Sequence, residues 1–76
     1  MRFTPFVRDT LAAMPAKQAA AFMRYFRTIE ACEGDHAESW PSSVPQVWVT
    51  EFDGRTIRYS RPAGSGPRPI SVSAIF

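Results

Sequence analysis

An Asp-Gly pair at residues 53–54 separates two runs that are rich in β-branched and aromatic residues, VWVTEF and RTIRYS. Asp and Gly tolerate the positive φ angles of a tight hairpin turn, so such a pair commonly joins two antiparallel strands. The pattern therefore predicts a β-hairpin over residues 47–60. The run ISVSAIF, which follows the Pro- and Gly-rich stretch RPAGSGPRP, predicts a third strand. Alternation places four of its residues on one face: Ile70, Val72, Ala74 and Phe76.

The segment before the hairpin has the pattern of two helices. Thr4 can cap a helix that has Pro5 at its first position and runs to about Met14. Pro15 interrupts this helix and can open a second one. The apolar residues of the second helix, at i, i+3, i+4, i+7 and i+10, are Ala19, Phe22, Met23, Phe26 and Ile29. Gly34 is a suitable stop, and the polar run EGDHAESWPSSVPQ indicates a connector.

This order predicts a single α+β domain over residues 1–76, with the elements in the order β-α-α-β-β-β. An N-terminal helical hairpin over about residues 5–32 is followed by a connector over 33–46 and an antiparallel sheet over 47–76. The sheet has three strands, which a short edge strand from residues 1–5 would extend to four. Because the helices pack on one face, the other face stays open to solvent or to a partner.

Composition excludes several classes of protein. Among its 76 residues the chain has one cysteine, Cys32, and one histidine, His36. An internal disulfide is therefore excluded, which fits a reducing cytoplasm better than secretion. The same scarcity leaves no Cys and His set for zinc, and we expect no metal and no other cofactor. No apolar run approaches the roughly 18 residues that span a membrane, and the N-terminal segment has no signal-peptide pattern.

Charge is segregated along the chain. Residues 1–31 carry five basic and two acidic side chains, and residues 32–54 carry five acidic side chains and no basic one. Residues 55–76 carry no acid and four arginines, namely Arg55, Arg58, Arg61 and Arg68. Arginine suits bidentate contacts with phosphate or carboxylate groups. The C-terminal third of the chain therefore suggests an anionic partner.

Strand alternation predicts where these arginines lie. Ile57 and Tyr59 should meet the helices, which directs Arg58 to the open face of the sheet. Arg61 and Arg68 are expected in the adjoining loop, and Arg55 at the rim beside the turn. Two interpretations stay open, because the arginines fit a binding surface and also fit a solvated face whose charges deter edge-to-edge aggregation.

Two aromatic residues also have two interpretations each. Trp40 lies in the polar connector, where an aromatic side chain is either an anchor for a partner or part of local packing. Tyr59 is either a core residue with its hydroxyl at water or a proton donor near the arginines. Local sequence does not decide between these roles.

The element order, with the segments MPAKQAAAFMRYFRTIEA, VWVTEFDGRTIRY and PISVSAIF, resembles the RelE/ParE superfamily of toxin–antitoxin systems. The resemblance implies a helical hairpin on a twisted antiparallel sheet, with an arginine shortly before a tyrosine on the middle strand. Arg55 or Arg58 with Tyr59 meets that pattern. RelE-type members cleave messenger RNA on the ribosome without a metal, whereas ParE-type members poison DNA gyrase. An antitoxin segment neutralises both types.

The sequence departs from the nuclease pattern after its last strand. RelE-type nucleases usually place a tyrosine, a histidine or further basic residues there, and this sequence has AIF. A nuclease would depend on Arg55, Arg58 and Tyr59, with fixed guanidinium groups stabilising the charge that accumulates on phosphate. The departure favours a binding protein, and a non-catalytic phage-type inhibitor, such as an anti-CRISPR protein, is the alternative.

The sequence therefore predicts a cytoplasmic, toxin-type protein that binds RNA, the ribosome or DNA gyrase through an arginine-rich sheet face. The residues expected to bind the nucleic acid or partner are Arg55, Arg58, Arg61, Arg68 and Trp40. The expected partners are an antitoxin or a host protein complex, without membrane association. A homodimer that protects a sheet edge stays open.

Overall fold

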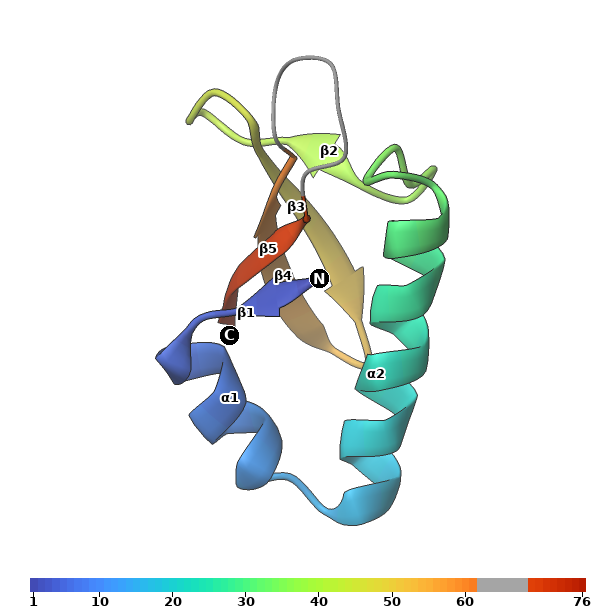
Figure 1. Cartoon of the computed structure of the whole chain (residues 1–76), viewed down its shortest axis with the longest axis vertical. Coiled ribbons are helices and arrows are strands. Elements are labelled where there is room, and N and C mark those ends of the chain that lie inside the picture. The colour runs from blue at the N-terminus through green and yellow to red at the C-terminus, as the bar shows by residue number, and fades with distance from the viewer. Residues whose placement is uncertain (62–68) are drawn as a thin grey trace.

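The computed structural model describes residues 1–61 and 69–76 (Figure 1). Within these residues the chain forms two helices and a five-stranded sheet, in the order β1 (Arg2–Phe3), α1 (Pro5–Ala12), α2 (Ala16–Ala31), β2 (Trp40–Pro41), β3 (Val47–Phe52), β4 (Arg55–Ser60) and β5 (Ser71–Ile75). The sheet order is β1-β5-β4-β3-β2, with β1 parallel to β5 and all other neighbours antiparallel. The protein is thus α+β, as predicted.

The predicted hairpin is confirmed. Strands β3 and β4 pair without a break from Val47 opposite Ser60 to Phe52 opposite Arg55. At the turn, Asp53 has a φ of 52° and Gly54 a φ of 73°. These are the two positive angles that a type I′ turn requires, and they match the right-handed twist of the strands that the turn joins.

Both predicted helices are present. The Thr4 hydroxyl accepts a hydrogen bond from the Val7 amide at 3.4 Å, with Pro5 at the first position of α1. Helix α2 ends near Gly34, whose amide donates to the Ile29 carbonyl at 2.9 Å because Glu33 before it has a left-handed φ of 54°. Helix α1 ends at Ala12, slightly before the predicted end. Neither described helix is long and apolar enough to cross a membrane.

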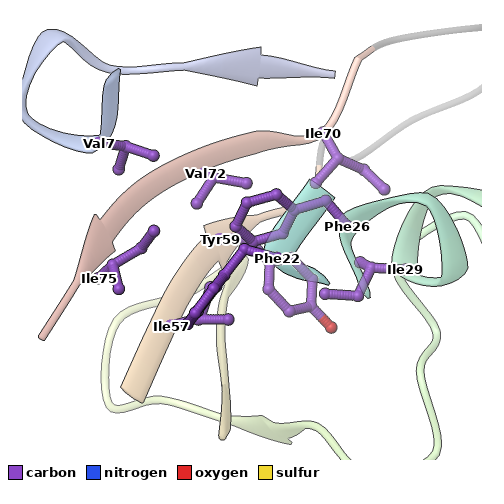
Figure 2. Close-up of a cluster of buried hydrophobic side chains, with 9 residues drawn as sticks. All are labelled: Val7, Phe22, Phe26, Ile29, Ile57, Tyr59, Ile70, Val72 and Ile75. Carbon is purple, nitrogen blue, oxygen red and sulfur yellow. The ribbon is translucent and has the colours of Figure 1, made fainter. Parts of the chain in front are cut away.

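The helices cover one face of the sheet and form the core with it (Figure 2). The core residues come from both helices, from β4, and from β5 and the residue before it: Val7, Phe22, Phe26, Ile29, Ile57, Tyr59, Ile70, Val72 and Ile75. Fully burying one aliphatic or aromatic side chain stabilises a fold by roughly 1.5–3 kcal/mol. This single cluster is therefore the main source of stability for so short a chain.

The predicted sheet was incomplete in two respects. Residues 1–5 do provide a strand, but β1 pairs parallel to β5, so the sheet is mixed and not purely antiparallel. The predicted connector contains a further edge strand, β2, in which Trp40 lies opposite Val49. A two-residue strand is too short for a hydrophobic period, and Pro41 is accepted there because an edge strand leaves some amide positions without a partner.

The predicted face of the last strand was wrong beyond Val72. The register between β4 and β5 shifts, because Tyr59 lies opposite Val72 while Arg58 lies opposite Ala74. Ser73 is therefore an extra residue, and such a bulge reverses the facing of the residues that follow it. Ile75 is buried in the core, whereas the side chain of Phe76 is 63% exposed.

Candidate binding face

The outer face is the face of the sheet that points away from the helices. A row of four paired residues crosses its centre. From β2 to β5 the row consists of Trp40, Val49, Arg58 and Ala74. Cross-strand partners share a face, and Arg58 lies between the two core residues of β4, so the whole row points away from the helices.

The outer face has a small apolar cluster of its own. Val49 is only 9% exposed, although it is not part of the cluster beneath the helices. Its cross-strand neighbour Trp40 is 44% exposed. A large aromatic side chain that is held at a fixed register and is still half open to solvent offers apolar area to a partner at little cost in conformational entropy.

Arg58 lies between this cluster and a second aromatic side chain. Its guanidinium carbon is 5.9 Å from the ring centroid of Phe76. Phe76 continues the pairing of β5, because its amide donates to the Thr56 carbonyl at 2.8 Å. Within the described residues Arg58 makes no ion pair. The outer face therefore presents an exposed cation between two exposed aromatic rings.

The predicted arginines do not converge on this face. Arg61 lies on the helix-covered side, where its guanidinium carbon is 5.0 Å from the ring centroid of Trp48 and its side chain passes close to Gly34. Arg61 directly follows β4, as predicted, but it does not share the outer face with Arg58, because its amide donates to the Gln46 carbonyl at 2.9 Å and so continues the pairing of β4. Alternation then sends Arg61 to the side of Tyr59.

Arg55 does not add to the outer face. Arg55 lies opposite Phe52 at the end of the hairpin and shares the helix-covered side with Ile57 and Tyr59. Its side chain is half-buried. Arg68 lies outside the described residues. Of the three arginines of the C-terminal third that the structure describes, Arg58 alone lies on the outer face.

Tyr59 is a core residue. Its side chain is fully buried, and its hydroxyl donates to the Gly34 carbonyl at 2.8 Å. Burial raises the pKa of the Tyr59 phenol above its ordinary value of 10.0. Since Arg58 points to the opposite face, Arg55, Arg58 and Tyr59 do not surround a common point at which a phosphate group can be bound.

A second aromatic cluster closes the β3 side of the core. The ring of Tyr25 stacks on Phe52 with centroids 4.4 Å apart and forms a T-shaped pair with the ring of His36 at a centroid distance of 5.2 Å. Its hydroxyl lies 2.6 Å from Oγ1 of Thr50, which is fully buried. Burial raises the pKa of Tyr25. This contact satisfies the buried threonine, so the cluster has a structural explanation.

Sequence reasoning identified Trp40 and Arg58 but missed Val49 and Phe76 as members of the outer face. The hairpin register, read from the Asp-Gly turn, gives the pairing of Val49 with Arg58. Nothing local indicates the bulge at Ser73 that brings Phe76 to the same face. No family model matches the chain, and neither a curated protein nor a solved structure is significantly similar to it.

Proposed function

We propose that the protein acts by binding and not by catalysis, with the outer face docking on a protein partner. The observation that carries this proposal is the exposed Arg58 between the exposed rings of Trp40 and Phe76. Tryptophan and arginine dominate the energetic centres of protein interfaces. The matching patch on the partner is apolar with a central carboxylate, which an arginine free of competing ion pairs can bind.

The distribution of cations favours a protein partner over a nucleic acid. A protein that tracks a phosphate backbone needs several cations along one path. Within the described residues, the other arginine on the outer face is Arg2, which lies opposite Ser71 of β5. Glu51 of β3 adds a negative charge to the same face. Of the other described basic residues, Arg55 and Arg61 lie on the helix-covered side of the sheet, and four lie on the helices: Arg8, Lys17, Arg24 and Arg27. A single central arginine is better suited to one carboxylate than to a chain of phosphates.

Within the RelE/ParE resemblance, this proposal corresponds to the non-nuclease type that acts by binding a protein target. Separation of Arg55, Arg58 and Tyr59 supports that choice over RNA cleavage. The non-catalytic phage-type inhibitor is the alternative, and it would use the same face on a different protein. The two versions differ in the effect of expression on a bacterial host.

To test the proposal, the tagged protein is expressed in bacteria, growth is followed, and the proteins bound to it are recovered. Trp40→Ala and Arg58→Glu are the test variants, and Arg8→Glu on α1 is the matched control because it changes charge at an exposed site away from the outer face. We expect both test variants to lose the partner while their melting temperatures stay unchanged, and the control to retain it. Equal recovery by all four proteins would refute the outer face as the binding site.

Growth separates the two versions of the proposal. A toxin-type protein arrests growth, and Arg58→Glu relieves the arrest while Arg8→Glu does not. An inhibitor-type protein is harmless in that host but still loses its partner with Arg58→Glu. Harmless expression of the wild-type protein therefore removes the toxin version and leaves the binding face to be judged by the recovery experiment.

A further inference from the structure

A pocket of about 170 Å³ opens beside the edge strand β1, away from the outer face. Its lining residues come from the N-terminal segment and from α2, and they are Met1, Phe3, Met23, Phe26, Arg27 and Glu30. Four of these six side chains are apolar, and the two methionines can adapt their shape to a ligand. In Figure 1 the N-terminal end of β1 points towards α2, and the Met1 ammonium group donates to the Glu30 carboxylate of that helix at 2.8 Å.

The neighbouring strand edge is open for pairing. The Arg2 amide donates to the Ile70 carbonyl at 2.8 Å, and the Thr4 amide donates to the Val72 carbonyl at 3.2 Å. Alternate residues of a strand direct their backbone groups to opposite sides. The N–H and C=O of Phe3 therefore point away from β5, and no hydrogen bond reaches them from the part of the chain that the structure describes.

The side chain of Phe3 shows which way an added strand would face. Its ring centroid lies 5.4 Å from that of Phe26, on the helix-covered side. Neighbouring strands place paired residues on the same face. A peptide that pairs with Phe3 would therefore direct one side chain towards α2, into the pocket between Met23 and Phe26.

The rim of the pocket has a positive charge available for a ligand. The carboxylate of Glu30 is 2.8 Å from the Met1 ammonium group and is neutralised by it. Arg27 is exposed and makes no ion pair within residues 1–61 and 69–76. The charge that is left favours an anionic group next to an apolar one.

From the pocket, the free edge and the charge we infer that β1 and α2 bind an extended acidic peptide segment of a partner protein. The segment adds as a strand to the Phe3 edge, places one large apolar side chain in the pocket, and directs a carboxylate to Arg27. Strand addition takes its affinity from backbone hydrogen bonds and its specificity from pockets for alternate side chains. This site does not depend on the outer face.

The test measures binding of fluorescently labelled heptapeptides by polarisation. The set has a central Leu, Ile, Phe or Met and Asp at the flanking positions. Matched peptides have a central Ala, have Lys in place of Asp, or have one backbone amide methylated at a time. We expect saturable binding by the acidic apolar-centred peptides. The central Ala should weaken it about tenfold or more, because it removes most of the apolar side chain that fills the pocket. Methylation of a peptide amide that points towards the Phe3 edge of β1 should abolish binding.

Protein variants locate the peptide on the chain. Arg27→Glu reverses the charge at the rim, and Arg24→Glu makes the same change on α2 at an exposed position that does not line the pocket. Arg27→Glu should weaken binding about fivefold or more and Arg24→Glu should leave it unchanged. The inference would be overturned if no peptide bound saturably, if no amide methylation affected binding, or if the two variants had equal effects. Binding of decanoic acid, a simple fatty acid, in the pocket without binding of any peptide would also overturn the inference.

Discussion

Replacing Gly34 with alanine tests the link between the end of α2 and Arg61. The φ of 82° at Gly34 is a left-handed conformation, which costs an L-residue roughly 1–2 kcal/mol. A Cβ atom there would lie 2.5 Å from Cγ of Arg61, so the arginine must move away from Trp48. The cation–π contact that is lost contributes about 0.5–1 kcal/mol. Together the two effects predict a loss of about 1.5–3 kcal/mol.

The control for this prediction is Gly54→Ala in the hairpin turn. Its φ of 73° carries a similar conformational cost, but an added Cβ would meet no atom within 4 Å. In a chain of this size 1 kcal/mol corresponds to roughly 4–8 °C, so Gly34→Ala should lower the melting temperature by about 6–24 °C. Gly54→Ala should lower it by about two-thirds as much, because only the conformational cost applies there. Circular dichroism during thermal and urea unfolding measures both. Equal losses in the two variants would refute the role assigned to Arg61.

Three further predictions concern stability. Tyr59→Phe removes the hydrogen bond to the buried Gly34 carbonyl and should cost about 1–2 kcal/mol in urea unfolding, with unchanged far-ultraviolet circular dichroism; a cost near zero would show that water replaces the hydroxyl. Thr4→Ala removes the cap of α1 and should cost about 1 kcal/mol, whereas Thr4→Ser should cost much less. Burial raises the folded-state pKa values of Tyr25 and Tyr59, so stability should be constant up to about pH 10 and fall as pH rises further; urea midpoints between pH 8 and pH 11 that do not fall would contradict this.

The parts of the fold that sequence predicts are those encoded by neighbouring residues. The Asp53-Gly54 turn, the Thr4 cap and the apolar stripe of α2 each depend on residues within a few positions of one another. The parallel pairing of β1 with β5 and the edge strand β2 depend on contacts between distant segments. No local hydrophobic period indicates β1 or β2, because each of them has only two residues.

The candidate face shows the same division. Alternation within β4 correctly separates Arg58 from Tyr59, since only two neighbours of the same strand are involved. The position of Phe76 depends on a bulge, and the position of Arg61 depends on continued pairing with Gln46. A shift of one residue in register changes the face of a side chain. Sequence therefore indicated the right kind of residue but not the surface that those residues share.

The location of β5 has a consequence for how the chain is made. This strand is the last of the sheet to be synthesised, yet it lies between β1 and β4. The Thr4 hydroxyl, for example, donates to the carbonyl of Ser73, 69 positions later. Until residues 71–75 leave the ribosome, β1 has no partner and the apolar faces of α1 and α2 stay incompletely covered. Contacts this distant in sequence also slow folding. Nascent copies should therefore need protection from aggregation until synthesis of β5 is complete.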